Sequence, residues 1–538
     1  MKRYHLQKCG VLFVFMLGVG GILFFTNAGN YYLWGDEGET ALYGKEILKH
    51  GLPYGFDGRN LFEFRNGYSL NRDFLPTISP WLQFYIAAMS MKIFGCSSFG
   101  ARALFILLSL VALITQFLFV SHYFKNQRLA YISLALLVTS VSFILFSRQS
   151  RYYALVMFLT PTLCYLYCLF KERKCEYFIV SFIFILLFLA NALIAVAFCV
   201  SSSISFFFFD NRLKTIKFFM IPLLIAVPFL GGFLLCLYQK GGITDPNFLR
   251  NIHPADFLKI IWLYFKDYNI AQLLPFGIIF ALAFVWYREG VFKGGEPFLK
   301  ARRELSILSI VILFTIILSI LSPQVSMADN SDIRYATAIF PFLLLLQAFV
   351  VEKVYIQRRL AAYVLLTVLV GTNLLTFTPF RSYIFEYVRE NVSPFDNSVK
   401  TAVRFLNNRI RSNDIVLVTP NHMLGSMEFY LGDNVLFCNV IGEDNKNLLA
   451  SGVKLPKYIY STDTIPDWIV LFGLGVDMPH TAKHLSKLNL SNYKIYAFPI
   501  MGPDVSRPEL FWRSFAPITH FPPEQGLFIL ERVKGKTS

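Results

Sequence analysis

The sequence predicts a polytopic α-helical membrane protein of about eleven transmembrane helices with a C-terminal extracytoplasmic α/β domain. Three observations support this fold class. Hydrophobic residues make up 55% of the 538 residues, whereas charged residues make up only 16%, against about 25% in soluble domains. Apolar runs of close to the ~20 residues that cross a bilayer recur up to about residue 378. Beyond this point, strand-like and helical patterns alternate.

The expected membrane spans follow one another with short polar loops between them. The first apolar run, from about Cys9 to Thr26, follows a basic start, and we interpret it as a retained anchor because many further spans come after it. Further spans are expected near residues 99–122, 129–147, 153–170, 177–190, 193–209, 218–238, 271–287, 305–322, 335–351 and 360–378. We therefore expect a transmembrane domain over residues 1–379.

Basic residues gather in alternate loops, which explains the formal charge of +16 by membrane orientation and not by nucleic-acid binding. The positive-inside rule places these loops and the N-terminus in the cytoplasm, provided that residues 177–190 and 193–209 form two separate spans. The first loop, residues 27–98, and the chain beyond Thr378 then face the outside. The basic clusters are Lys125 and Arg128; Lys171, Arg173 and Lys174; Arg212, Lys214 and Lys217; Arg288, Lys293, Lys300, Arg302 and Arg303; and Lys353, Arg358 and Arg359.

The C-terminal tail, residues 380–538, is expected to form the outer α/β domain. Its strand-like runs are Asp414–Thr419, Trp468–Phe472, Lys494–Pro499 and Leu527–Val533. No glycine-rich phosphate loop follows a strand, which argues against a soluble nucleotide-binding module. The eight cysteines of the chain lack paired spacing and predict neither a disulfide framework nor a zinc site.

The first outer loop contains two adjacent carboxylates, Asp36 and Glu37, within the segment WGDEGETALYGKEILKHG. Charged carboxylates beside the low-dielectric interior of a membrane are disfavoured unless they are hydrated, paired, or needed as bases or ligands. The alternative is that one of them caps the helix that begins near Gly38. Because a cap needs one acid and the chain supplies two, we expect a chemical role for the pair.

Arginines and tyrosines gather at the outer ends of other spans, against the orientation bias. The segment SRQSRYY carries Arg148, Arg151, Tyr152 and Tyr153, NSDIRY carries Asp332, Arg334 and Tyr335, and Arg102 begins the second span. The planar fork of arginine suits phosphate, so these residues are candidates for holding the phosphate of a lipid-linked donor. The alternative is an interfacial anchor in which arginine snorkels to headgroups and tyrosine joins the aromatic belt.

Together these motifs resemble the glycosyltransferase family 39 type, which includes the protein O-mannosyltransferases and the aminoarabinose transferases of lipid A. The resemblance covers roughly residues 1 to 380. It rests on the Asp-Glu pair after the first span and on ETALYGKEILKHGLPY, SPWLQFYIAAMSMKIFG, FGARALF, SRQSRYYAL and DIRYATAIFPFLLL, in this order. It implies a GT-C membrane glycosyltransferase that takes a sugar from a polyprenyl-phosphate carrier on the outer face of a bacterial inner membrane.

The resemblance also implies roles for individual residues. Asp36 and Glu37 fall on the catalytic Asp-Glu motif. In an inverting transfer, Asp36 would take the proton of an acceptor hydroxyl, a role typically worth about 10² to 10⁴ in rate. Arg148 and Arg151 would stabilise the departing phosphate. Donor-phosphate binding is thus expected from Arg148, Arg151, Tyr152, Tyr153, Arg334 and Tyr335.

Acceptor or loop support is expected from Glu63, Asp73 and Arg102. No cofactor is required by the sequence. Binding of a divalent metal is an open alternative, for which Glu63 and Asp73 together with His253 are the candidate ligands.

The expected partners are the polyprenyl-phosphate sugar donor, the lipid bilayer, and a glycan, lipid or protein acceptor, but no nucleic acid. The sequence names neither the sugar nor the acceptor.

Two other classes of function compete with the transferase. A multi-pass transporter or flippase of a lipid-linked or anionic substrate is expected to carry duplicated halves and polar groups at mid-membrane, whereas here the charges gather at the outer ends of the spans. A non-catalytic membrane sensor with an outer ligand-binding domain would tolerate replacement of Asp36.

Overall fold

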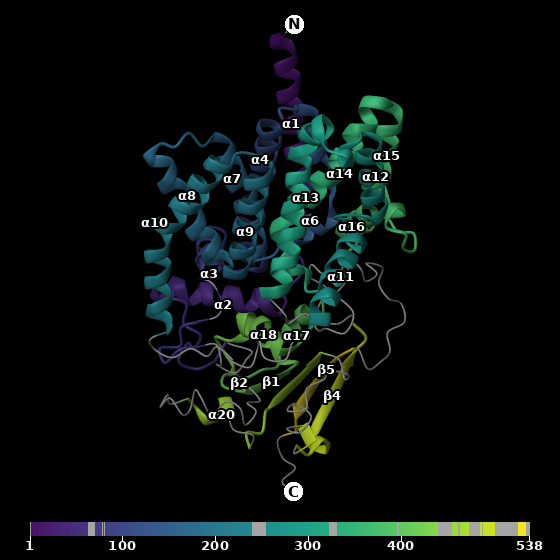
Figure 1. The fold of residues 1–538 in the computed structure, drawn as a ribbon. Helices are drawn as coiled ribbons and strands as arrows, with labels where there is room; N and C mark the ends of the chain where they lie inside the picture. Colours follow the sequence, from purple (N-terminus) through teal and green to yellow (C-terminus); the bar gives the residue numbers. More distant parts are fainter. Residues whose placement is uncertain are drawn as a thin grey trace.

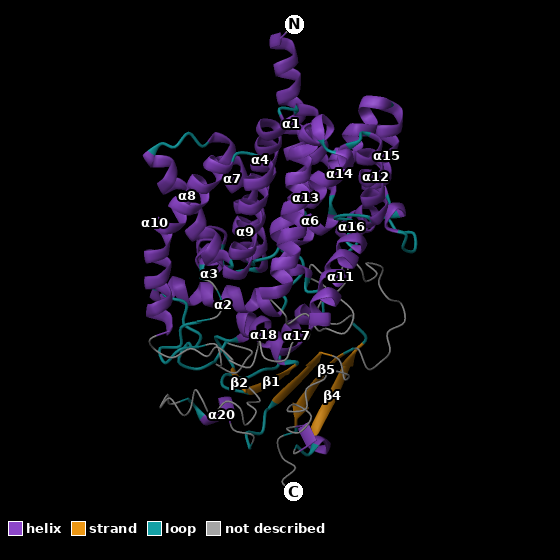
Figure 2. Cartoon of the chain, in the orientation of Figure 1, coloured by secondary structure: helices purple, strands orange, loops and turns teal. Residues whose placement is uncertain are grey.

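The protein, a computed structural model, consists of a helical bundle with a five-stranded sheet beyond one of its ends (Figure 1, Figure 2). The structure describes residues 2–62, 70–77, 79, 81–238, 254–321, 331–394, 397–438, 455–460, 463–472, 485–486, 488–500 and 526–533. The N-terminus lies at the end of the bundle away from the sheet. Helix α2 (Gly35–His50) crosses the other end, between the bundle and the sheet (Figure 1).

One large apolar core holds the bundle together, and many of its aromatic side chains are fully buried. The other helices before the sheet are α1 (Lys2–Phe25), α3 (Leu82–Phe94), α4 (Ser98–Phe124), α5 (Gln127–Thr139), α6 (Val141–Ser147), α7 (Tyr152–Leu169), α8 (Lys174–Ala190), α9 (Ala192–Phe209), α10 (Arg212–Tyr238), α11 (Pro254–Ile270), α12 (Phe276–Arg288), α13 (Gly295–Leu321), η2 (Ile333–Ile339), α14 (Phe340–Gln357), α15 (Arg359–Gly371), α16 (Tyr383–Val392) and α17 (Ser398–Asn407).

The membrane bundle predicted from the sequence is confirmed. Among the described residues, α4, α7, α9, α10, α13 and the continuous pair η2 and α14 are long and apolar enough to cross a membrane. Helices α5 and α6 bend by 66° at Ser140 and make a seventh span if they are counted as one. The remaining expected spans lie on α1, α8, α12 and α15, which are shorter apolar segments. Helices α8 and α9 are separate because Asn191 ends one and caps the next, its side chain accepting a bond from Ile194 N.

The sheet has the strand order β2-β1-β3-β5-β4. Strands β1 (Ile415–Thr419), β2 (Leu436–Cys438) and β3 (Trp468–Phe472) run parallel, whereas β5 (Leu527–Arg532) pairs antiparallel with β3 and with β4 (Tyr493–Phe498). The register places Val416 opposite Trp468, and Val470 opposite Ile529. The four strands predicted from the sequence are confirmed, while β2 was missed because three residues carry too short a pattern. The short helix α20 (Lys457–Tyr460) lies near β2.

The sheet domain packs against the bundle through helix α18 (Leu424–Leu431), which follows β1 and the turn η4 (Asn421–Met423). Helices α18 and α2 approach at glycines, because a Cβ atom on Gly38 would lie 2.4 Å from Ser426 N, and one on Gly425 would lie 2.8 Å from Glu39 N. Lys45 Nζ adds a bond of 2.8 Å to the carbonyl of Phe429. The C-terminal chain therefore supports the helix that carries Asp36 directly. The boundary near residue 380 remains a prediction.

Candidate functional site

Asp36 lies in the first turn of α2, where two arginines from distant segments meet its carboxylate. Arg334 Nη1 lies 2.9 Å and Arg151 Nη2 lies 3.3 Å from the same oxygen, Oδ2. The Asp36 side chain is 13% exposed, so the cluster is partly open. Helix α2 begins after Trp34, and no side chain caps it. The alternative that Asp36 or Glu37 serves as a helix cap is therefore wrong.

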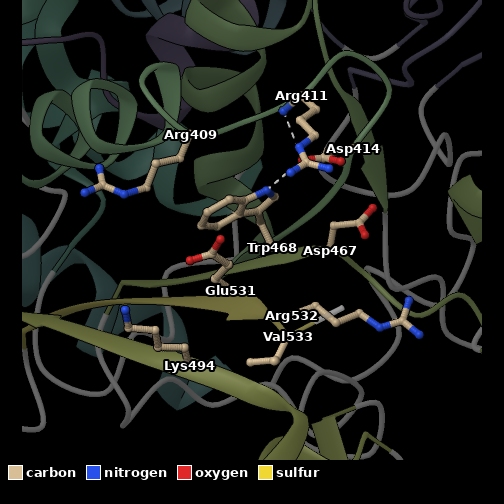
Figure 3. Close-up of a pocket in the computed structure, with 9 residues that line it drawn as sticks. All are labelled: Arg409, Arg411, Asp414, Asp467, Trp468, Lys494, Glu531, Arg532 and Val533. Carbon is tan, nitrogen blue, oxygen red and sulfur yellow. Dashed lines mark hydrogen bonds between the residues drawn. The ribbon is translucent and has the colours of Figure 1, made fainter. Parts of the chain in front are cut away.

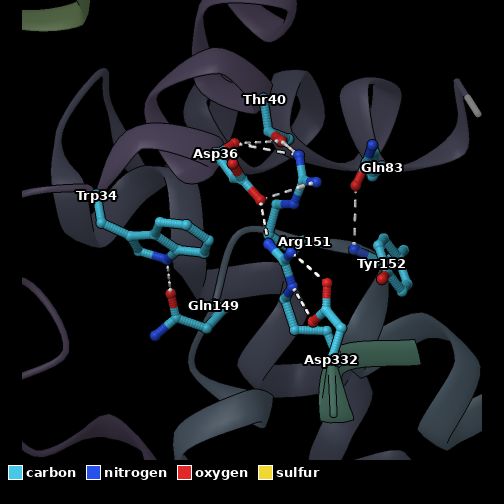
Figure 4. Close-up of polar contacts among 9 residues, drawn as sticks. Trp34, Asp36, Thr40, Gln83, Gln149, Arg151, Tyr152 and Asp332 are labelled. Carbon is cyan, nitrogen blue, oxygen red and sulfur yellow. Dashed lines mark hydrogen bonds and ion pairs between the residues drawn. The ribbon is translucent and has the colours of Figure 1, made fainter. Parts of the chain in front are cut away.

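Arg151 occupies the N-cap position of α7 and is held on α2 by three contacts (Figure 4). Besides the carboxylate, its Nη1 atom donates to the backbone carbonyl of Asp36 at 3.2 Å and to Thr40 Oγ1 at 3.1 Å. Burial disfavours the charged guanidinium, but Asp36, together with Tyr153, Glu39 and Tyr152, offsets this and keeps the pKa of Arg151 above its usual value. Arg151 is thus a permanent cation in this site.

Arg334 comes from the turn η2 at the start of α14 and joins two carboxylates. Its Nε atom donates to Asp332 Oδ1 at 2.6 Å while its Nη1 atom contacts Asp36. The cluster therefore contains two acids and two arginines, and it is balanced in charge without a ligand. An incoming phosphate would compete with Asp36 and Asp332 for the same guanidinium groups.

Glu37 is fully buried and has partners other than those of Asp36. Arg102 meets it with two nitrogens, the Nε atom lying 2.8 Å from Oε1, and Ser150 N donates to the same oxygen at 2.8 Å. Arg102 also donates to the carbonyls of Ala28 and Tyr31. With both Glu37 oxygens occupied, this pair fastens the end of the first span to α2 and α4, and Asp36 remains the candidate base.

The two arginines of SRQSRYY are not brought together. Arg148 donates to Tyr387 Oη and to the carbonyl of Thr26 at 2.9 Å, on the side of α1 and α16. The tyrosines stay together, since the rings of Tyr152 and Tyr153 have centroids 4.6 Å apart. The ring of Tyr152 lies 6.4 Å from that of Tyr335, and the Arg151 guanidinium lies 5.8 Å from the Tyr152 ring. The ring of Tyr153 is buried in the bundle core.

Neutral side chains complete the site and were not expected from the sequence. Gln149 Oε1 accepts a bond of 2.6 Å from Trp34 Nε1, and Gln83 Oε1 accepts one from Tyr152 N (Figure 4). Thr40 was missed too, although its position four residues after Asp36 on a helix was a usable signal for a shared face.

The residues offered for a metal are not assembled by the described chain. Asp73 is exposed in a turn, where its own N–H donates to Asn71 Oδ1. Glu63 and His253 lie outside the described residues. Within the described ranges, no group of three or more His, Cys, Asp or Glu side chains is placed to hold a metal ion. The metal site stays a prediction.

No protein-family model and no curated protein sequence matches the chain. Similarity appears in three dimensions. The structure of ArnT from Cupriavidus metallidurans bound to undecaprenyl phosphate aligns with 96% of this chain and 97% of its own, with a TM-score of 0.53 and 12% identity. The apo state of the same protein aligns over 97% and 98%, with a TM-score of 0.54 and 12% identity.

A second solved relative extends this similarity. The archaeal oligosaccharyltransferase AglB from Archaeoglobus fulgidus, in complex with an inhibitory peptide and a dolichol-phosphate, aligns with 92% of this chain and 73% of its own. The TM-score is 0.52 and the identity 11%. The chain has the GT-C fold. The predicted fold is thereby confirmed, since the similarity spans the bundle and the C-terminal domain together. At 11–12% identity the comparison shows the fold alone, so the roles of residues in this chain depend on the geometry above.

Proposed function

We propose that this protein is an integral membrane glycosyltransferase that transfers a sugar from a polyprenyl-phosphate-linked donor to a glycan, lipid or protein acceptor on the outer face of the membrane. The observation that carries the proposal is the contact of Arg151 and Arg334 with Asp36 at the sheet-facing end of a GT-C bundle. A base and two phosphate-binding cations are the groups that such a transfer needs.

In the proposed reaction, Asp36 accepts a proton and the two arginines stabilise the leaving phosphate. The acceptor hydroxyl oxygen attacks the anomeric carbon of the sugar, its proton passes to the Asp36 carboxylate, and the bond from that carbon to the phosphate oxygen breaks. The lipid phosphate leaves with the bonding electrons, and Arg151 and Arg334 stabilise its negative charge. Attack from the face opposite the leaving phosphate inverts the configuration at the anomeric carbon.

The contacts of Asp36 in the protein without a donor suggest how donor binding activates this carboxylate as a base. In the free protein both arginines neutralise Asp36. A phosphate that draws the two guanidinium groups toward itself weakens their hold on the carboxylate and raises its basicity. Asp332 keeps Arg334 anchored through its Nε atom during this exchange.

The membrane orientation of the proposal follows from charge. The five basic clusters predict a cytoplasmic N-terminus, so the end of the bundle that carries α2 and the C-terminal domain faces outward. A polyprenyl-phosphate donor would then present its headgroup at this end while its tail stays in the bilayer. The resemblance to family 39 supports a bacterial inner membrane as the location.

The proposal is tested by turnover of radiolabelled polyprenyl-phosphate sugars. The purified protein in lipid is incubated with a broad donor panel, and wild type is compared with Asp36→Asn and Arg151→Ala. Glu296→Gln serves as a matched acid-to-amide control, because Glu296 is 77% exposed and lies on α13, outside the site.

We expect wild type and Glu296→Gln to consume one sugar-lipid, and Asp36→Asn to bind it without turnover. Absence of binding and reaction across the panel, together with intact cellular function of Asp36→Asn, would refute the transferase and favour the transporter or the sensor. Net movement of a labelled lipid across the membrane in proteoliposomes, without breakage of its sugar bond, would identify the transporter.

A further inference from the structure

A cavity, separate from the Asp36 cluster, lies in the C-terminal sheet where β1 and β3 begin and β5 ends (Figure 3). Its volume of about 360 Å³ falls in the range of roughly 300–1,000 Å³ that is typical of small-ligand pockets. The opposite end of β1 leads within three residues to His422, whose carbonyl faces Gly35 of α2. The cavity therefore lies at one end of the strands, and the opposite end of β1 leads to the Asp36 helix.

Four cations line this cavity, and they come from three separate segments of the chain. Arg409 and Arg411 follow α17, Lys494 stands in β4, and Arg532 ends β5. Figure 3 shows them on different sides of the Trp468 indole, with the Arg409 and Arg532 side chains extending away from it in opposite directions. In the part of the chain that the structure describes, none of the four forms an ion pair.

Aromatic rings hold two of these cations without neutralising them. The Arg409 guanidinium lies 4.0 Å from the centroid of the Phe405 ring, and the Lys494 ammonium lies 4.9 Å from that of Tyr496. A cation over an aromatic face is oriented but keeps its full charge toward other ligands. The Arg409 guanidinium and the Lys494 ammonium thus keep a positive charge that an anion can bind.

The carboxylates in the wall are engaged by neutral donors. Asp414 Oδ2 accepts from Trp468 Nε1 at 3.0 Å, and Asp467 Oδ2 accepts from Ile415 N at 3.1 Å. Glu531 Oε2 accepts from Tyr496 Oη at 2.7 Å. These acids fix the strand ends and keep their charge, so the lining carries four positive and three negative side chains.

We propose that this cavity binds the phosphate group of a small molecule or of a glycan. Phosphate suits the site because arginine presents two parallel N–H groups to two of its oxygens, and several cations can share its charge. The position of the cavity on the distal edge of the sheet favours a water-soluble or glycan phosphate over a lipid headgroup. The site does not depend on the transferase activity.

The test uses the full-length protein in nanodiscs of neutral phosphatidylcholine, labelled with 5-fluorotryptophan. The Trp468 resonance is assigned by its loss in Trp468→Phe and is then followed during titration with pyrophosphate at constant ionic strength. Arg411→Gln and Lys494→Gln are compared with Arg404→Gln, which removes an exposed arginine of α17 that does not line the cavity. Nanodiscs containing phosphatidylglycerol form a second arm.

We expect a saturable shift of the Trp468 signal, unchanged in Arg404→Gln and weakened roughly tenfold or more in Arg411→Gln and Lys494→Gln, as for loss of a charged hydrogen bond. A shift caused by phosphatidylglycerol alone would keep the phosphate site and assign it to lipid headgroups. A Trp468 signal that ignores pyrophosphate, or that moves equally in all three variants, would overturn the proposal. Both outcomes are independent of donor turnover, so they are distinguishable from failure of the transferase function.

Discussion

Arg334 Nη1 lies 2.9 Å from Asp36 Oδ2 although the two residues are 298 positions apart in the chain. The contact joins η2 to the start of α2 at the sheet-facing end of the bundle. Because Arg334 also holds Asp332, the Asp36 carboxylate is set against a fixed cation and not against a freely moving surface side chain. This relationship makes the site sensitive to single substitutions in predictable ways.

Arg148 and Arg151 form a natural matched pair for mutation, since both are largely buried arginines of one loop but only Arg151 reaches Asp36. Arg151→Gln should lower kcat by roughly 10² to 10³, the usual loss when one preorganised donor to a developing anion is removed. Arg148→Gln should instead lower the melting temperature, because Tyr387 and Thr26 lose their partner. Turnover and thermal unfolding measured on both variants separate the two effects. Equal losses of kcat at equal stability would contradict the division.

Glu37→Gln should destabilise the fold by about 3–5 kcal/mol, since it leaves the buried Arg102 guanidinium without its counter-charge. Thermal unfolding in detergent measures the loss. The double variant Glu37→Met with Arg102→Met is the control, because replacing a whole buried pair by apolar groups is far less costly. A Glu37→Gln protein with unchanged stability and abolished turnover would show that Glu37 is catalytic after all.

Gly38→Ala should separate α18 from α2 and destabilise the protein by about 1–3 kcal/mol, as overpacking does. The added methyl group would lie 2.4 Å from a backbone nitrogen, which no side-chain rotation can relieve. Gly371→Ala is the matched control, since a methyl group there meets nothing within 4 Å. Unfolding temperatures of the two variants check the prediction, and a Gly38→Ala protein as stable as Gly371→Ala would argue against the close crossing.

Glu428 should make stability depend on pH. Its carboxylate is buried in α18, and neither oxygen has a hydrogen-bond partner within the described structure. Burial, followed by the nearby charges of Asp57 and Glu39, raises its pKa well above the ordinary value of 4.5. The folded state therefore holds the proton more tightly, so its contribution is complete below about pH 4.5 and is lost as the pH rises through the raised pKa.

Melting temperatures at pH 5 and pH 8 test this linkage. We expect Glu428→Gln to lose less stability than wild type between the two values, because the amide carries no titrating proton. Asp433→Asn, which removes a carboxylate that is 79% exposed, should follow wild type. Parallel pH curves for wild type and Glu428→Gln would count against a protonated Glu428.

The sequence was sufficient to predict that some residues of the candidate site lie together, but not which side chains and backbone groups contact one another. Asp36, Arg151 and Arg334 could be predicted together because span counting and the positive-inside rule bring the ends of distant helices to one side of the membrane. The partners of Glu37 and Arg148 could not, since backbone carbonyls and a tyrosine of α16 become neighbours only through tertiary packing. The same holds for β2, whose three residues gain strand structure from pairing with β1.

The crossing of α2 and α18 also has a consequence for biosynthesis. Lys45 and Phe429 are 384 positions apart, so at about 5–20 residues per second the ribosome needs roughly 20 to 80 s between making one and the other. During this interval the helix that carries Asp36 lacks its packing partner α18. A chain that stops before α18 lacks the contact that supports the Asp36 helix, so the proposed site stays incomplete until the C-terminal chain has been made.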